Sequence, residues 1–345
     1  AELHHERALR IRQEHLGAEH METLNSIGDL AWLRCDQGRN TEAAELLDKA
    51  LSISRRVLGE DHVTTLSFAN TLGCVYKDLG RYEEAEKLYL KSIPVSLRVF
   101  GEKKTMSLFM VGNLGQVYEA QRRYDDAERQ YLKTLRMRDG FWDDESIWTL
   151  LYKSFLARVY MKQKLYNEAE ELYLDILPIQ RRVDGDQQLR TLWSVIGLAQ
   201  VYTHLEKYDE AENLFNEALA TLQSSEHWGT VRQCMNGLAA LYAKQEMYDK
   251  AELLYKEALE ISSRRLGNDH PDTLETKNDL AVLYKEQARY EEAEKFLLEA
   301  IEGRRLKLGY QHPHTVESFN NLIELYKTWN KPKKAKQWRA ILPQT

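Results

Sequence analysis

The residues that could carry metal or acid–base chemistry in this chain of 345 residues are a few histidines and many glutamates. His4 and His5 are adjacent, and His312 and His314 are two residues apart. Such neighbours do not share a face of a helix, so neither pair predicts a metal site. Glutamates occur in runs that recur at a fixed phase, which favours solvent-exposed helix faces over general acids and bases. These glutamates are Glu83, Glu84, Glu168, Glu291 and Glu292.

Motifs for nucleotide phosphates, zinc proteases and serine hydrolases are absent from the sequence. The three cysteines, Cys35, Cys74 and Cys234, lie far apart and include no C-x-x-C pair. Such a sparse, odd set is typical of reduced thiols in a cytosol-like compartment. The sequence therefore predicts no catalytic residue, no bound metal and no cofactor, and we do not expect an enzyme.

Composition narrows the classes of partner. The net charge is -6, so the chain lacks the basic footprint of a nucleic-acid-binding protein. No apolar run approaches the roughly 18 residues that span a bilayer. Gly and Pro are scarce, at 17 and 6 residues, which favours long helices. We expect a cytoplasmic, helical protein that binds neither nucleic acid nor membrane.

The elements that position all these residues are revealed by a repeat. Tyrosines recur at intervals of 42, 42, 42, 40, 42 and 42 residues, at Tyr76, Tyr118, Tyr160, Tyr202, Tyr242, Tyr284 and Tyr326. A leucine lies four residues before each tyrosine, and a small residue follows that leucine in all copies but the last. Leucine, small residue and tyrosine at this spacing share one helical face, so each copy predicts a helix, here called the first helix of the repeat.

A second helix follows in each copy. An alanine lies nine residues after each tyrosine, for example Ala85, Ala169 and Ala293. We expect it where two helices approach closely. Because one helix pair cannot bury its apolar faces alone, neighbouring pairs must stack. Asp61 and Asp269 precede two of the first helices and are expected to cap them.

The spacings Leu72-Gly73…Tyr76 and Ala85…Tyr89 resemble the signature of the tetratricopeptide repeat, in the long, 42-residue form found in kinesin light chains. This resemblance implies an all-α, right-handed superhelical solenoid of antiparallel helix pairs, with eight pairs and one leading helix. We predict a single solenoid over residues 1–345. Its predicted parts are 1–16, the second helix of a truncated repeat, then repeats 17–57, 58–99, 100–141, 142–183, 184–224, 225–265 and 266–307, and a last repeat with its cap at 308–345.

The two ends of the chain support this division. Ala1 and Ala8 align one period before Ala43 and Ala50, so the chain begins inside a second helix, and we expect a longer parent polypeptide. At the other end, a basic segment around Lys333 replaces the acidic run of the other repeats. A polar, atypical last repeat is typical of a solenoid cap.

In the family that the chain resembles, first helices line a concave groove. The residues 9, 6 and 2 before each repeat tyrosine and 1 and 2 after it lie opposite the core face, and we call them the groove stripe. Large apolar residues occupy this stripe in the central repeats, at Phe109, Leu151, Met161, Trp193 and Ile196. An exposed apolar patch predicts an interaction site, although packing between neighbouring helices is the alternative. The linker residues Trp142, Trp148 and Trp228 are interpreted as part of the fold.

Asparagines occupy the stripe six residues before the tyrosine at Asn70, Asn236, Asn278 and Asn320. An exposed amide can bond both the N–H and the C=O of an extended peptide, and the resemblance implies that these asparagines hold a ligand backbone. The alternative is a polar residue on a wet surface. Basic residues on the stripe are Lys77, Arg158, Lys162, Lys244, Lys285 and Lys327. The acidic residues that oppose them are Asp36, Asp78, Glu119, Glu286 and Glu324.

These residues together predict a non-catalytic scaffold that binds a protein or peptide. The basic residues around Arg158 favour an extended, acidic partner with a bulky apolar side chain. The alternative is a ligand-sensing segment of a larger signalling protein, such as a nucleotide-binding receptor or a Ser/Thr kinase. A purely architectural role without a groove ligand is a third hypothesis.

Overall fold

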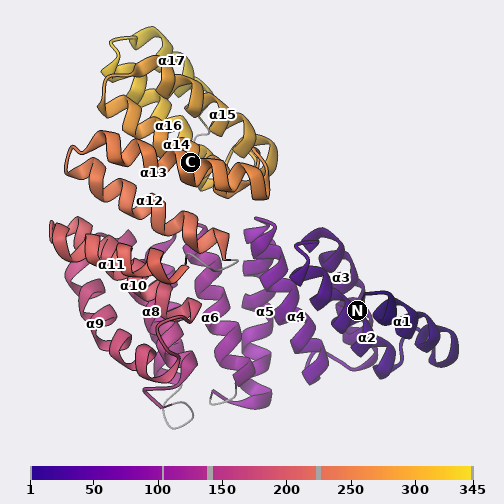
Figure 1. Cartoon of the computed structure of the whole chain (residues 1–345). Coiled ribbons are helices and arrows are strands. Elements are labelled where there is room, and N and C mark those ends of the chain that lie inside the picture. The colour runs from indigo at the N-terminus through magenta and orange to yellow at the C-terminus, as the bar shows by residue number, and fades with distance from the viewer. Residues whose placement is uncertain (1, 103–104, 138–142, 223–226, 343–345) are drawn as a thin grey trace. The chain divides into compact units, whose positions relative to one another are not determined.

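The chain folds entirely into helices in the residues that its computed structural model describes, which are 2–102, 105–137, 143–222 and 227–342. These residues form 17 helices and no strand. After the leading helix α1 come eight pairs, which confirms the predicted all-α repeat fold (Figure 1). The helices are α1 (Glu2–Leu16), α2 (Met21–Asp36), α3 (Asn40–Val57), α4 (Val63–Asp78), α5 (Tyr82–Phe100), α6 (Thr105–Ala120), α7 (Tyr124–Met137), α8 (Ile147–Lys162), α9 (Tyr166–Val183), α10 (Leu189–His204), α11 (Tyr208–Leu222), α12 (Trp228–Lys244), α13 (Tyr248–Leu266), α14 (Pro271–Glu286), α15 (Tyr290–Leu308), α16 (Pro313–Thr328) and α17 (Pro332–Ile341).

The chain divides into two compact units, residues 1–159 and 160–345, which are described separately below. The first unit holds α1–α7 and most of α8, and the second holds the end of α8 and α9–α17. First helices are the even-numbered ones and second helices are the odd-numbered ones from α3 onward. Helices α5, α13 and α15 each extend one residue beyond the predicted repeat boundary.

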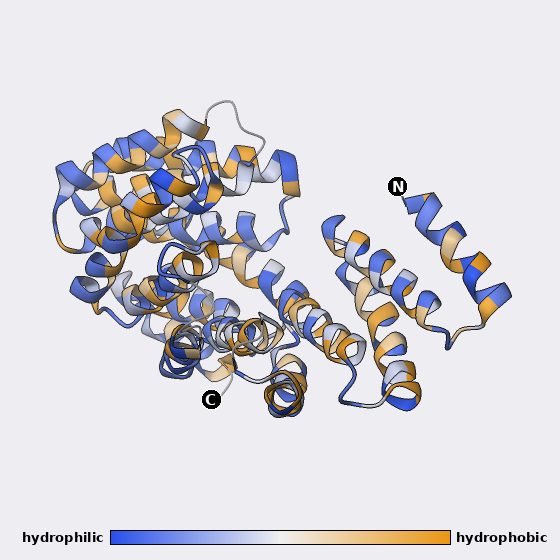
Figure 2. Cartoon of the chain, turned by 90° about the horizontal axis from the view of Figure 1, so that it is seen from below, coloured by the Kyte–Doolittle hydropathy of each residue, from blue (hydrophilic) through white to orange (hydrophobic). Residues whose placement is uncertain are grey.

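The core of each unit lies between the two helices of a pair and between neighbouring pairs. The repeat alanines, including Ala85 in the first unit and Ala169 in the second, are buried. Gly73 shows how close the helices come, because a Cβ atom there would lie 2.4 Å from the ring of Tyr89. Apolar and polar residues alternate along each helix in Figure 2, as expected for helices buried on one side.

Repeat tyrosines join the first helices α4, α12, α14 and α16 to the second helix of the preceding repeat. The Tyr284 hydroxyl donates a hydrogen bond of 3.1 Å to Glu252, and the Arg289 guanidinium lies 4.1 Å from the Tyr284 ring centroid. Burial of Glu252 works in the opposite direction, but hydrogen bonds from Arg289, Lys256 and Tyr284 hold the pKa of its carboxyl group down at about 2. The same arrangement of tyrosine, carboxylate and arginine therefore fastens one repeat to the next.

Histidines, rather than the predicted aspartates, cap the first helices α2, α4, α14 and α16. The Nδ1 atoms of His62 and His270 accept hydrogen bonds of 3.2 Å from the backbone N–H groups of Thr64 and Asp272. His20 and His312 cap α2 and α16 in the same way. The prediction for Asp61 and Asp269 was wrong because the capping position falls one residue later, where the imidazole supplies the acceptor. In the described part of the chain, no helix has the length and apolar character needed to cross a membrane.

Candidate peptide-binding surface

The groove stripe of the first unit is tied together by polar side chains on α4 and α6. Asn70 is half-buried, and its Oδ1 accepts a hydrogen bond of 3.1 Å from Asn113. Lys77 donates a hydrogen bond of 3.2 Å to Gln116 and forms an ion pair of 3.1 Å with Asp78. These two predicted ligand-binding residues therefore also connect neighbouring first helices.

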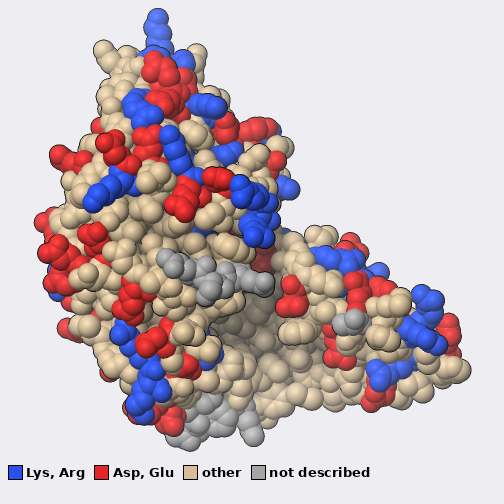
Figure 3. Space-filling model, viewed as in Figure 1, with Lys and Arg blue, Asp and Glu red and all other residues tan. Residues whose placement is uncertain are grey.

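Aromatic residues form a partly exposed pair at the start of α8. Phe109 is half-buried and meets Trp148 edge to face, with ring centroids 4.6 Å apart. Trp148 is 41% exposed, so this residue, predicted only as a part of the fold, is accessible beside Phe109. Leu151, one turn further along α8, is half-buried. The hollowed surface where α6 lies is largely uncharged in Figure 3, in agreement with the single charged residue of this helix, Glu119.

Arg158 does not present an uncompensated charge. Its guanidinium donates two hydrogen bonds to Glu119, at 2.5 and 2.9 Å, and lies 4.8 Å from the Phe155 ring centroid. Glu119 also accepts a hydrogen bond of 2.9 Å from Tyr131. A bidentate pair of this kind fixes the guanidinium between α6 and α8.

The second unit exposes one aromatic residue on α10. Trp193 is 44% exposed, and its indole N–H donates a hydrogen bond of 3.3 Å to the hydroxyl of Thr230 on α12. Met161 is half-buried at the end of α8. Ile196, in contrast, is 0% exposed, so the prediction that it faces the groove was wrong. Its stripe position is covered by neighbouring helices, and its side chain belongs to the core.

Two of the predicted backbone-holding asparagines are buried in the second unit. Asn236 is 9% exposed and donates a hydrogen bond of 3.0 Å to Thr276. Asn278 is 3% exposed and accepts hydrogen bonds from Ser318 at 3.2 Å and from Asn321 at 3.1 Å. The expected exposure is therefore wrong for both, because their amides bond the next first helix. Asn320 is exposed.

Arg304 extends the network around Asn278. Its side chain is 2% exposed and donates hydrogen bonds to the backbone carbonyl of His314 at 2.7 Å and to Ser318 at 2.8 Å. Burial, followed by the charge of Glu275, raises the pKa of the nearby Asp279 to about 7, while Arg304 opposes this shift. Helices α14, α15 and α16 thus share a buried polar network.

The last turns of α8, α10 and α12 carry an exposed basic group. Lys162 and Lys244, both predicted as binding residues, are exposed at the ends of α8 and α12. His204 ends α10 and stacks on Tyr166, with ring centroids 4.5 Å apart and an interplanar angle of 8°. Burial, and then the positive charges of Lys244, Lys162 and Lys164, lower the pKa of His204.

Sequence comparison agrees with this geometry. The model of the tetratricopeptide repeat family matches residues 33–97, 69–139, 148–224 and 231–306, well over half of the chain. The chain belongs to the tetratricopeptide repeat family. No curated protein sequence matches it.

Three solved structures illustrate the likeness in fold. A putative kinesin light chain from Podosopora anserina with nearly identical TPR-like repeats is 23% identical, with a TM-score of 0.52, and the match covers 59% of this chain and 96% of that one. NprR in complex with its cognate peptide NprX is 15% identical, with a TM-score of 0.64 and coverage of 94% and 90%. A STAND signal-transduction ATPase with a tetratricopeptide repeat sensor, from Pyrococcus horikoshii, is 16% identical, with a TM-score of 0.56 and coverage of 98% and 51%. The fold thus resembles that of kinesin light chains, as the 42-residue period predicts.

Sequence reasoning missed one exposed residue on the stripe of this tetratricopeptide repeat protein. Trp32 lies on α2 in the first unit and is 65% exposed. Arg34 replaces the repeat tyrosine in this first copy, and Trp32 precedes it by two residues, which is a groove-stripe position. Counting the stripe from Arg34 would have identified it. Trp142 lies outside the described residues, and Trp228 packs against Arg265, whose guanidinium lies 4.5 Å from the ring centroid.

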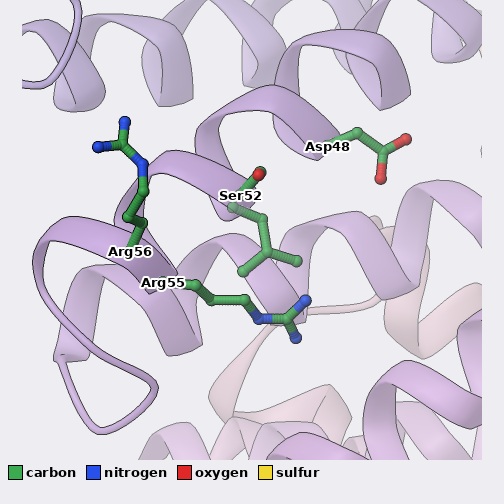
Figure 4. A pocket seen from close by; sticks show the side chains of 5 residues that line it. Asp48, Ser52, Arg55 and Arg56 are labelled. Atoms are coloured by element: carbon green, nitrogen blue, oxygen red, sulfur yellow. The ribbon is translucent and has the colours of Figure 1, made fainter.

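A shallow depression on α3 is a weaker candidate site. It measures about 540 Å³ and is lined by Asp48, Leu51, Ser52, Arg55 and Arg56, whose side chains point in different directions (Figure 4). Its charged groups are already occupied, since Asp48 accepts a hydrogen bond from Tyr76 and the two arginines pair with Glu60 and Glu19. The described residues contain no group of three His, Cys, Asp or Glu side chains arranged to hold a metal ion.

Proposed function

We propose that this chain is a binding scaffold without catalytic activity, whose first helices hold an extended segment of a partner protein or peptide. The preferred segment carries acidic residues and a bulky apolar side chain. The observation that carries the proposal is the exposed but fixed side chain of Trp193.

Trp193 has the properties of a binding anchor. Nearly half of its surface is exposed, although a tryptophan of this size gains by burial. The hydrogen bond from its indole to Thr230 fixes the ring before any partner arrives. An ordered ring loses little conformational entropy on binding, and tryptophan is enriched among the residues that dominate binding energy.

The first helices around Trp193 favour an acidic partner. Helices α8, α10 and α12 contain no Asp or Glu residue. Their basic residues are Lys153, Arg158, Lys162, Arg190, Arg232 and Lys244. Although several of these are paired with carboxylates from other helices, first helices that carry no acidic residue of their own favour a negatively charged ligand. NprR, which shares this fold, is known in complex with a peptide, and this supports a peptide ligand.

The proposal is tested by selecting peptides from a random display library on the whole chain. We expect enrichment of peptides that combine acidic and aromatic residues, and loss of their binding to the double variant Trp193→Ala and Phe109→Ala. The matched control replaces Leu174 and Leu253, which are exposed on the second helices α9 and α13, by alanine. Circular dichroism must show unchanged helicity in both. Equal binding by the two double variants, or a selection that enriches nothing, would refute the proposal.

The same surface would also suit a ligand-sensing segment of a larger signalling protein, because a sensor binds its ligand in the same way. The fold of this chain resembles that of a STAND ATPase with a tetratricopeptide repeat sensor. The hypothesis of a larger signalling parent protein stays a prediction from the sequence.

A further inference from the structure

The ends of the first helices differ in charge along the chain. The residue two positions after the repeat tyrosine is acidic in the first copies, at Asp36 and Asp78, and acidic again at Glu286. Between them, three successive first helices carry Lys162, His204 and Lys244 at this position. A basic residue at a helix C-terminus suits the helix dipole, but that explanation applies equally to every first helix. It does not account for basic residues confined to three neighbouring copies, at a position that is acidic or uncharged in the other copies.

The basic groups lie close together in the second unit. Lys162, Lys164 and Lys244 are all exposed, and their charges all act on His204. His204 is held in place by its stack on Tyr166, and the Lys244 ammonium group is 3.4 Å from the backbone carbonyl of Thr203. Lys244 therefore approaches α10 beside His204, and the charges of Lys162, at the end of α8, and Lys164, in the turn after it, act on the same imidazole.

No carboxylate in the described part of the chain lies within ion-pair distance of these three lysines. At other first-helix ends the lysine has an acid, as in the ion pair between Lys77 and Asp78 and that between Lys327 and Glu324. Glu206 and Glu246 follow His204 and Lys244 by two residues, in exposed turns. Neither glutamate is among the groups that shift the pKa of His204. Like charges held together in this way repel one another, and an anion bound between them relieves the repulsion.

We propose that Lys162, Lys164, His204 and Lys244 form a basic end site, which binds the carboxylates of an acidic segment of the partner. This inference rests on the proposed function and assigns the acidic part of the ligand to one place. It also predicts how far apart the acidic residues and the bulky apolar residue lie in the ligand. Trp193 and His204 are eleven residues apart on α10 and so share one helical face, separated by about 16 Å at 1.5 Å per residue. An extended peptide spans this distance in roughly five residues.

The first test uses the peptides selected on the whole chain. Selected peptides should carry acidic residues about five positions from an aromatic one, and the double variant Lys162→Gln/Lys244→Gln should bind them roughly tenfold more weakly. The matched control is Lys285→Gln/Lys327→Gln, which removes the same charge from first helices that carry an acid nearby. If the selected peptides lack acidic residues, or bind both double variants equally, the basic end site is refuted while the binding scaffold stands.

The second test needs no selected peptide. A failure of the basic end site can therefore be distinguished from a failure of the scaffold hypothesis. The pKa of His204 is followed by NMR in the whole chain, with and without triglutamate. We expect triglutamate to raise this pKa, because it screens the three lysines, and to have no such effect in Lys162→Gln/Lys244→Gln. An unchanged pKa at saturating probe refutes the site. If a phosphoserine peptide raises it and triglutamate does not, the assignment to carboxylates is refuted in favour of a phosphopeptide.

Discussion

The stretch from α10 to α12 and the stretch from α14 to α16 are built on the same repeat but use its groove stripe differently. In the first, Trp193, His204 and Lys244 are exposed. In the second, Asn278 and Arg304 are buried in a hydrogen-bonded network that joins three helices. These three residues of the first stretch are accessible to a partner, although Asn236 of the same stretch is buried against Thr276. Asn278 and Arg304 of the second stretch have their polar groups satisfied internally. Polar residues on the stripe thus identify either a binding surface or a contact between repeats, and burial decides which.

The largest change in stability is expected for a substitution of Arg304, in the buried network of the second stretch. Replacement by methionine removes the donor to His314 and Ser318 and should lower the free energy of unfolding by about 3 kcal/mol, because a buried charged partner is lost. Urea unfolding measures this. Arg264→Met, at a highly exposed position on α13, is the control and should change stability by less than about 0.5 kcal/mol. A similar loss in both variants would contradict the network.

A somewhat smaller effect is expected at Asn278. Asn278→Ala removes the acceptor of Asn321 and one of the two acceptors of Ser318, and should cost about 2 kcal/mol. Asn320→Ala, at an exposed position, should cost almost nothing. Thermal unfolding of both variants measures the difference. If Asn320→Ala proved the more destabilising of the two, the distinction between buried and exposed amides would fail.

Asp279 gives a pH-dependent test of the same network. Its pKa is raised by burial to about 7 from an ordinary 3.8, so the neutral form is favoured in the folded chain. Its contribution to stability is therefore fully present below about pH 4 and is lost as the pH rises toward 7. Asp279→Asn should raise the melting temperature by a few degrees at pH 8 and leave it unchanged at pH 4. If the substitution changed the melting temperature equally at pH 4 and pH 8, the proposed titration of Asp279 would be excluded.

The smallest effect is expected in the exposed stretch. Lys244→Gln removes one of the charges that lower the pKa of His204, so this pKa should rise, with little change in stability. NMR titration of the His204 ring measures the shift. Lys285→Gln is the control, because Lys285 is not among the groups acting on His204. A fall in the pKa would show that the lysine does not act through its charge.

The fold was predictable because its signals are local and repeated. Tyrosine, leucine and alanine at fixed spacing report burial between adjacent helices, and a 42-residue period leaves few alternatives. The helix caps were less predictable, since Asp61 and His62 are adjacent and only the backbone geometry shows which one caps. Preference tables favour aspartate at such a position.

The candidate site was only partly predictable. Stripe positions identified Trp193, Lys162 and Lys244, all of which are exposed. They failed for Asn278, because its burial depends on the small polar Ser318 of the next first helix, 40 residues away in the sequence. Phase along one helix determines which way a side chain points, but the residues of the neighbouring helix determine whether anything covers it.

Similar tyrosine junctions recur along the chain. Tyr76 on α4 reaches Asp48 on α3, and Tyr284 on α14 reaches Glu252 on α13 by the same chemistry. Arg81 and Arg289 lie over these two rings at the same distance, 4.1 Å. The carboxylate lies 32 residues before the tyrosine at both Tyr284 and Tyr326, so a gene segment that runs from Tyr284 to Tyr326 carries both halves of one junction. Duplication of such a segment would add a matched junction, and the array could lengthen at this place during evolution without a redesigned interface.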